Sequence, residues 1–134
     1  MGGRSVIYLL DTHALLWALT SPGRLGPEAR TVIRDRASRL LVSAVTAWEI
    51  ATKHRLGKLP HADAIVEGYG RHLDVLGVGR LPVSDEHALL AGKLDWDNRD
   101  PFDRILAAQA MIESATLLTM DPDLRALPGV ATRW

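Results

Sequence analysis

Short apolar runs alternate with helix-like segments along this chain, and the alternation restricts its fold more than any other feature. The runs at 6–10, 39–44 and 115–120 are rich in strand-forming residues. The segments after them place apolar residues at helical spacing or begin with helix-capping residues. Short strands that alternate with helices of about 10 to 15 residues are typical of an α/β fold built on a parallel sheet. We therefore expect this architecture.

The remaining chain is divided by its glycines, prolines and capping residues. Helical spacing predicts helices at 12–19, 27–37, 61–74, 84–94 and 99–114, and a further helix from 45 that stops at Gly57 and Pro60. The stretch 74–84 predicts a short strand, and the tail 122–134 predicts a turn of helix and an edge strand. At 134 residues, we expect one domain over 1–134.

Composition restricts the ligands and the compartment. Sixteen basic residues balance sixteen acidic ones, so net charge indicates no nucleic-acid or membrane partner. Because the chain has no cysteine, disulfides and thiolate metal sites are excluded, and carboxylates and histidines remain as metal ligands. No apolar run approaches the roughly 18 residues of a membrane span. We expect a cytoplasmic protein with no membrane partner.

Four acids lie where predicted strands give way to predicted helices. Asp11 and Asp121 directly follow apolar strands, and Glu49 and Asp103 are placed in the first turn of a helix. In open parallel sheets, the ends of strands and the starts of the following helices gather along one edge, where ligands bind. Acids that are far apart in the sequence are therefore expected to meet there.

Each acid also has a simpler explanation as a helix cap. Asp11 fits an N-cap, Thr46 with Glu49 fits a capping box, and Asp100 fits an N-cap before Pro101. Asp103 would favour the positive end of its helix dipole, and Asp121 before Pro122 repeats the Asp-Pro pattern. Serine, threonine or asparagine caps as well as aspartate does, so capping does not explain why all these junctions are anionic.

Clustered carboxylates raise one another's pKa unless a cation neutralises them. A site that offers carboxylate oxygens, without cysteine or paired histidines, suits Mg²⁺ or Mn²⁺ better than Zn²⁺. Such hard cations are used for phosphoryl chemistry, in which they activate water and stabilise charge on phosphate. The four acids therefore predict a divalent metal site.

The sequence blocks that carry these acids resemble a known family. "YLLDTHALLWAL", "SAVTAWEIATKHRLGKL", "RDPFDRILAAQA" and "LLTMD" are similar, in order and spacing, to the four acidic blocks of the PIN domain, in particular of VapC-type toxins of bacterial type II toxin–antitoxin pairs. The resemblance covers 9–134 and implies a three-layer α/β/α sandwich with a short central parallel sheet. It also implies a Mg²⁺- or Mn²⁺-dependent endoribonuclease that cuts single-stranded RNA, a homodimer, and an antitoxin partner.

The resemblance also assigns residues to roles. It implies that four acids act as catalytic residues and metal ligands, namely Asp11, Glu49, Asp103 and Asp121. Asp100 either faces the metal through water or caps its helix. Thr12 and Thr119 would hydrogen-bond the first and fourth acids or the metal's waters, and Asp123 would act similarly. The stretch "LDWDNRD" departs from relatives that carry histidine before "RDPFDR", so a histidine role in substrate binding is not expected there.

Three cations lie near these blocks and are candidates for RNA binding. Lys53 follows Glu49 by one helical turn, so it either pairs with that carboxylate or reaches a phosphate. Arg99 and Arg104 flank the "DPFD" block, where they either position the RNA backbone or remain solvated. His13 is interpreted as structural. Trp17 and Trp48 lie among apolar helical neighbours, which predicts core or dimer packing.

Three other functions compete with the nuclease. The main alternative is a PIN-like domain that binds RNA or an antitoxin without cutting. A phosphatase of the haloacid-dehalogenase type, with Asp11 as nucleophile, would need a second aspartate where this chain has His13. A receiver-type phosphoacceptor domain would need paired acids after the first strand and a late lysine, and "LLDTH" and "LLTMD" supply neither.

Overall fold

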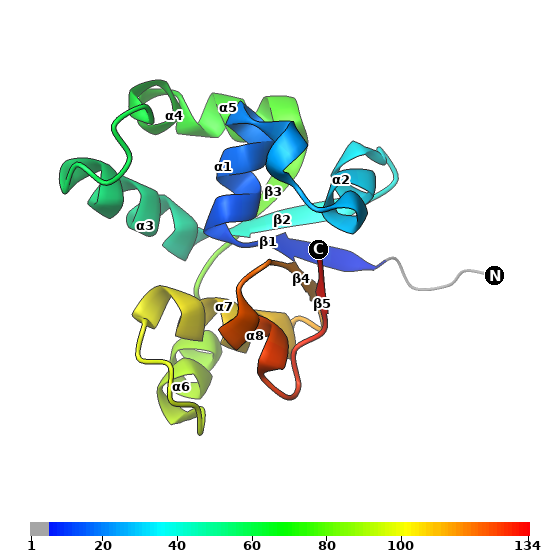
Figure 1. Ribbon diagram of the computed structural model, residues 1–134. Coiled ribbons are helices and arrows are strands. Elements are labelled where there is room, and N and C mark those ends of the chain that lie inside the picture. The colour runs from blue at the N-terminus through cyan, green and yellow to red at the C-terminus, as the bar shows by residue number, and fades with distance from the viewer. Residues whose placement is uncertain (1–5) are drawn as a thin grey trace.

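A computed structural model describes residues 6–134 and shows a five-stranded parallel sheet with helices on both faces (Figure 1). The strand order is β3-β2-β1-β4-β5. The strands are β1 Ile7–Leu10, β2 Arg39–Ser43, β3 Val78–Leu81, β4 Thr116–Leu118 and β5 Thr132–Arg133. The three-layer α/β/α sandwich and its short parallel sheet are therefore as expected from the sequence.

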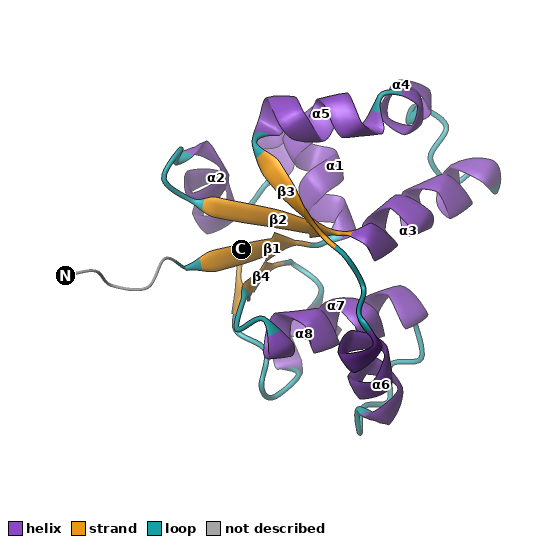
Figure 2. Cartoon of the chain, turned by 180° about the vertical axis from the view of Figure 1, so that it is seen from behind, coloured by secondary structure: helices purple, strands orange, loops and turns teal. Residues whose placement is uncertain are grey.

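The helices form two layers that the sheet separates (Figures 1 and 2). One layer consists of α1 Thr12–Thr20, α2 Pro27–Arg34, α3 Ala44–Arg55, α4 Asp63–Glu67 and α5 Tyr69–Leu76, with the 3-10 turn η1 Pro22–Arg24. The other consists of α6 Asp85–Lys93, α7 Pro101–Ile112 and α8 Pro122–Ala126. Each face of the sheet has its own apolar core, because successive side chains of a strand point to opposite faces: Leu10 belongs to one core and Leu9 to the other.

The order in which strands are added to the sheet reverses at β1. The chain passes from β1 outward to β2 and β3 and then returns, through α6 and α7, to β4 on the other side of β1. In open α/β sheets, ligands bind at this switch point, beyond the carboxyl ends of the two diverging strands. A backbone hydrogen bond of 3.2 Å from the Asp11 N–H to the Leu118 carbonyl joins the ends of β1 and β4 there.

Two predicted helices differ from their spacing, one by an interruption and one by an early end. The helix predicted at 61–74 is divided into α4 and α5 at Gly68, a residue of low helix propensity. The helix predicted at 27–37 ends at Arg34, because the Asp35 carboxylate accepts a hydrogen bond of 2.9 Å from the Ala37 N–H. Such local hydrogen bonds compete with those of the helix.

Among residues 6–134, no helix has both the length and the apolar character needed to cross a membrane.

Candidate active site

The four predicted acids line one small pocket at the carboxyl edge of β1 and β4. Its volume is about 120 Å³. Its lining residues are Asp11, Thr12, His13, Glu49, Lys53, Asp100, Asp103, Leu106, Met120 and Asp121. The acids come from the end of β1, from α3, from α7 and from the loop after β4. We call this the acid pocket; it is the place where the sequence predicted that the acids would meet.

Asp11 is both a helix cap and a buried member of the pocket. Its Oδ1 accepts a hydrogen bond of 2.8 Å from the Ala14 N–H at the start of α1, so the capping interpretation also holds. Its side chain is almost fully buried. Burial raises the pKa of Asp11 above its ordinary value, although hydrogen bonds from Thr119 and Ala14 act in the opposite direction. The fold thus keeps this carboxylate inside at a cost in desolvation.

Glu49 lies in the second turn of α3, and not in the first as predicted, because the helix begins at Ala44. The capping box with Thr46 is therefore wrong: Ser43 is the N-cap, and its hydroxyl accepts a 3.0 Å bond from the Val45 N–H. Capping does not explain Glu49, which is buried and faces the pocket. The predicted pairing of Lys53 with Glu49 is present as an ion pair on one turn of α3.

Thr12 contacts a different acid from the predicted ones, whereas Thr119 lies at the first and fourth acids. The Thr12 hydroxyl donates to Glu49 Oε1, so Thr12 holds the second acid rather than the first or fourth. Thr119 is fully buried, and its Oγ1 accepts a 3.0 Å hydrogen bond from the Asp121 N–H. Because its side chain also bonds the Asp11 carboxylate, Thr119 connects the first and fourth acids. Both threonines keep carboxylates oriented within the pocket.

Asp103 has the most perturbed pKa among the exposed or half-buried acids of the pocket. Its pKa is raised to about 6, chiefly by desolvation and also by the negative charges of Asp100, Asp121 and Glu49, whereas a hydrogen bond from Asn98 lowers it. Asn98 Nδ2 donates to Asp103 Oδ2 at 3.0 Å. The sequence interpretation missed Asn98, because its contact depends on how the loop before α7 folds back.

The raised pKa of Asp103 has a consequence for stability. Between the ordinary aspartate pKa of about 3.9 and about 6, the folded protein binds more protons here than the unfolded chain, so its stability falls as pH rises through this window. Asp103→Asn removes this loss. Asp103 is half-buried, and solvent screens its charge. We therefore expect the unfolding free energy of the variant, relative to that of the wild type, to be about 1 kcal/mol higher at pH 7 than at pH 4.

Urea unfolding in EDTA at pH 4, 5, 6 and 7 measures this difference. Other titrating groups are common to both proteins, so the difference between wild type and Asp103→Asn isolates the one carboxylate. Asp97→Asn, a change at an exposed position in the same segment, serves as the control and is expected to follow the wild type. Parallel stability curves for wild type and Asp103→Asn would contradict the raised pKa of Asp103.

The structure gives Asp100, Asp121 and Asp123 different positions: the first two line the acid pocket, and Asp123 does not. Asp100 is the N-cap of α7, as one of its two predicted roles requires, and its carboxylate also lines the acid pocket. Asp121 caps α8 and accepts a 2.8 Å bond from the Asp123 N–H. The Asp123 side chain is exposed and lines a neighbouring pocket instead. Its predicted support of the metal ligands therefore has no contact in this structure.

The prediction that Arg104 binds RNA is wrong, because all its nitrogens are occupied by the protein. Nε donates to the carbonyl of Ala91, Nη1 to those of Trp96 and Asn98, and Nη2 to that of Leu94, at 2.6 to 2.9 Å. Arg104 thus fastens the segment 94–98 to α7. Arg99 is exposed and its RNA contact stays a prediction.

The Trp48 and His13 side chains are both exposed to solvent. Trp48 is 60% exposed and packs edge-on against Phe102, with ring centroids 4.8 Å apart, so core packing is excluded for it. Trp17 does pack against the apolar core. His13 is exposed and lines the acid pocket, a position that its lone place on the first helix did not indicate.

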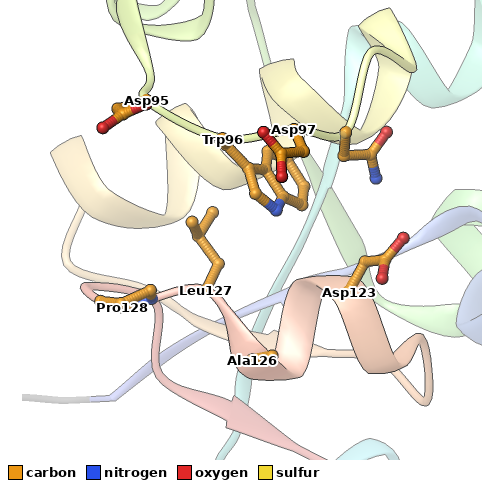
Figure 3. A pocket seen from close by; sticks show the side chains of 8 residues that line it. Asp95, Trp96, Asp97, Asp123, Ala126, Leu127 and Pro128 are labelled. Carbon is orange, nitrogen blue, oxygen red and sulfur yellow. The ribbon is translucent and has the colours of Figure 1, made fainter.

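A second, larger pocket lies beside the acid pocket and is strongly acidic. It has a volume of about 580 Å³, and Figure 3 shows it between the segment 95–98 and α8. Its ionisable lining residues are Asp95, Asp97 and Asp123, with no basic residue among the residues that line it. Asn98 belongs to this pocket and bonds Asp103 of the acid pocket, so the two are adjacent.

The acid pocket suits a hard divalent cation by charge and by donor type. Five carboxylates line it, and Lys53 is the one ammonium among its lining residues. One oxygen of Asp103 and one of Asp121 accept no hydrogen bond within the described part of the chain. These acids offer oxygen ligands, which Mg²⁺ and Mn²⁺ prefer. In residues 6–134, however, no three acidic or histidine side chains stand close enough to enclose an ion. Glu49 and Asp103 are each held by protein partners.

Comparisons with known proteins agree with this architecture. The family model described as "PIN domain" matches residues 8–130. Ribonuclease VapC16 of Mycobacterium tuberculosis (strain ATCC 25618 / H37Rv) is 35% identical over 60 residues, which are 45% of this chain and 43% of that relative. The match thus spans less than half the length of that curated relative.

Solved structures show the same fold. The crystal structure of DNA-bound VapBC from Salmonella typhimurium superposes with a TM-score of 0.69 at 18% identity and covers 96% of this chain and 97% of that one. VapBC2 from Rickettsia felis, bound to a DNA fragment from its promoter, gives a TM-score of 0.68 at 16% identity, with 96% and 99% covered. At these identities, the likeness establishes the fold.

Proposed function

This chain belongs to the PIN domain family, and from this premise we propose that it is a Mg²⁺- or Mn²⁺-dependent endoribonuclease that cuts single-stranded RNA. The observation that carries the proposal is the excess of negative charge in the acid pocket, where five carboxylates face one ammonium. Such an excess, partly desolvated, favours a divalent cation. The partial match to a named ribonuclease supports RNA as the substrate class.

The acids divide into two groups by their contacts. Asp11, Asp103 and Asp121 line the pocket without a cationic partner among the described residues, so these three would hold the ion after their side chains move closer together than they lie here. The ion supplies Lewis acidity for water and stabilises charge that develops on phosphate. Glu49 is held by Thr12 and Lys53, and it would join the site by exchanging Lys53 for the ion. Lys53 would then be free to face the phosphate of the RNA.

The partners follow from the same comparisons. Because the solved structures with this fold include VapBC and toxin–antitoxin complexes, we propose that the chain is the toxin of such a pair and has a cognate antitoxin. We also propose a homodimer in the cytoplasm. The exposed indole of Trp48 beside Phe102 supports an interface, since aromatic side chains are enriched in protein–protein interfaces.

Cleavage of RNA by the purified protein tests the function. We expect a labelled single-stranded RNA of mixed sequence to be cut in Mg²⁺ or Mn²⁺ and to stay intact in EDTA, because the carboxylates alone would repel its phosphates. Cutting that continues in EDTA would contradict the proposed metal dependence. If RNA binds but is not cut with either ion, the protein is instead a PIN-like binding module.

A further inference from the structure

A groove in the layer of α1 and η1, which the sheet separates from the layer that holds α8 and the Trp96 segment, has the reverse charge (Figure 1). It has a volume of about 440 Å³ and lies between α1, the turn η1 and the segment 58–62. Its ionisable lining residues are His13, Arg24, Lys58 and His61, with no carboxylate among the residues that line it. We call it the basic groove. In a chain with equal numbers of acidic and basic residues, the charges are therefore segregated around the acid pocket.

The basic groove and the acid pocket are adjacent. His13 is exposed and lines both, so a ligand that leaves the acid pocket over this imidazole enters the groove. On the other side, a ligand would meet Asp95, Asp97 and Asp123, all carboxylates. A polyanion that passes through the acid pocket is repelled on that side and attracted on the side of the groove.

The cations of the groove are held in place by local structure. Gly57 takes a left-handed conformation with φ of 76°, and the Lys58 N–H then bonds the Lys53 carbonyl at 2.9 Å, which ends α3 with a Schellman turn. This turn directs the chain into the groove. Arg24 lies over the ring of Trp17, 4.7 Å from its centroid. Neither Arg24 nor Lys58 has an ion-pair partner within residues 6–134.

The groove also offers flat surfaces for bases. Trp17 is half-buried and forms tilted contacts with His13 and Trp134, at centroid distances of 5.4 and 5.8 Å. Aromatic rings and arginine guanidinium planes stack on the bases of single-stranded nucleic acids, whereas nearby cations follow the phosphates. A volume of this size is within the roughly 300–1,000 Å³ typical of ligand sites.

We propose that the basic groove binds the single-stranded RNA substrate on one side of the cut, with Arg24 and Lys58 at its phosphates and Trp17 with the Arg24 guanidinium beneath its bases. The inference rests on the proposed function, because it assigns a substrate subsite to that nuclease. It also gives the substrate a direction: the strand extends from the acid pocket over His13 and away from the acidic pocket at 95–98.

Steady-state cleavage at several salt concentrations tests the groove. The variant Arg24→Gln/Lys58→Gln removes two charges but keeps polar side chains of similar reach. We expect its KM for a short single-stranded RNA to rise about ten-fold at low salt, with the change falling on KM rather than on kcat. The slope of log(kcat/KM) against log[salt] should become less negative by about 1.4, because each phosphate that a cation neutralises on a single strand contributes about 0.7 to it.

A control removes the same net charge elsewhere. Arg36→Gln/Lys93→Gln alters an arginine and a lysine that are exposed and do not line the groove, and we expect less than a two-fold change in KM. If the groove variant behaves as this control does while wild type cuts RNA, the groove is not a substrate subsite and the nuclease proposal stands. If wild type itself does not cut RNA in Mg²⁺ or Mn²⁺, the nuclease and the subsite both fail.

Discussion

Asp11→Asn is expected to lower the rate of RNA cleavage on the order of 100-fold or more without unfolding the protein. Asparagine is nearly the same size, and it caps helices as well as aspartate does, so the bond to the Ala14 N–H is retained. The change removes one of the negative charges that would hold the cation, and such electrostatic terms supply much of the rate enhancement in metal-assisted phosphoryl chemistry. Single-turnover cleavage of a labelled RNA measures the loss.

The matched control for this variant is Asp35→Asn. Asp35 is exposed and also accepts a backbone bond, from the Ala37 N–H, so the same chemical change is made at a local cap outside the pocket. Its cleavage rate should equal that of the wild type. Equal stability of both variants, checked by thermal unfolding in EDTA, would show that a lost rate is not lost folding. A cleavage rate for Asp11→Asn within a few-fold of wild type would contradict the role assigned to the acid pocket.

Arg104→Met is expected to cost about 3 kcal/mol of unfolding free energy. The guanidinium donates to the carbonyls of four residues, and methionine keeps much of the apolar stem but leaves those carbonyls without a donor. Unpaired, partly buried carbonyls each cost about 1–3 kcal/mol, less where water replaces the donor. Arg104→Lys should recover less than half of the loss, because one ammonium cannot match the planar fork.

Denaturant unfolding of these variants checks the prediction. Arg99→Met, at an exposed position in the same loop, should change stability by less than about 0.5 kcal/mol. Because Arg104 also fixes Asn98, its loss should weaken the hold on Asp103 and reduce cleavage as well. A loss below about 1 kcal/mol for Arg104→Met would show that the segment 94–98 is held by other contacts.

The helix start at Asp100 and the position of Asp11 after a strand could be predicted, because residues next to each other in the sequence determine both. The Asp-Pro pair at 100–101 indicates a helix start in any α/β chain, and the structure begins α7 there. The strand before Asp11 and the parallel sheet place this acid at the ligand-binding edge without any knowledge of its neighbours. For the same reason, the gathering of Asp11, Glu49, Asp103 and Asp121 followed from topology rather than from contacts.

The contacts among side chains could not be predicted, because they depend on how loops and helices pack. Arg104 has the same sequence neighbours whether it faces solvent or its four carbonyls, and only the path of the segment 94–98 decides between them. Thr12 contacts Glu49 because α1 and α3 lie on the same face of the sheet. The apolar neighbours of Trp48 indicated core or dimer packing, and α3 turns that position outward, away from the core.

The central claim is that the acid pocket binds a divalent cation, and Mn²⁺ titration followed by electron paramagnetic resonance tests it most directly. The signal of free Mn²⁺ reports binding without RNA and without turnover. We predict that wild type and Asp35→Asn bind Mn²⁺ with equal affinity and that Asp11→Asn binds it at least ten-fold more weakly. Equal binding by all three proteins, or no binding by the wild type, would contradict the account.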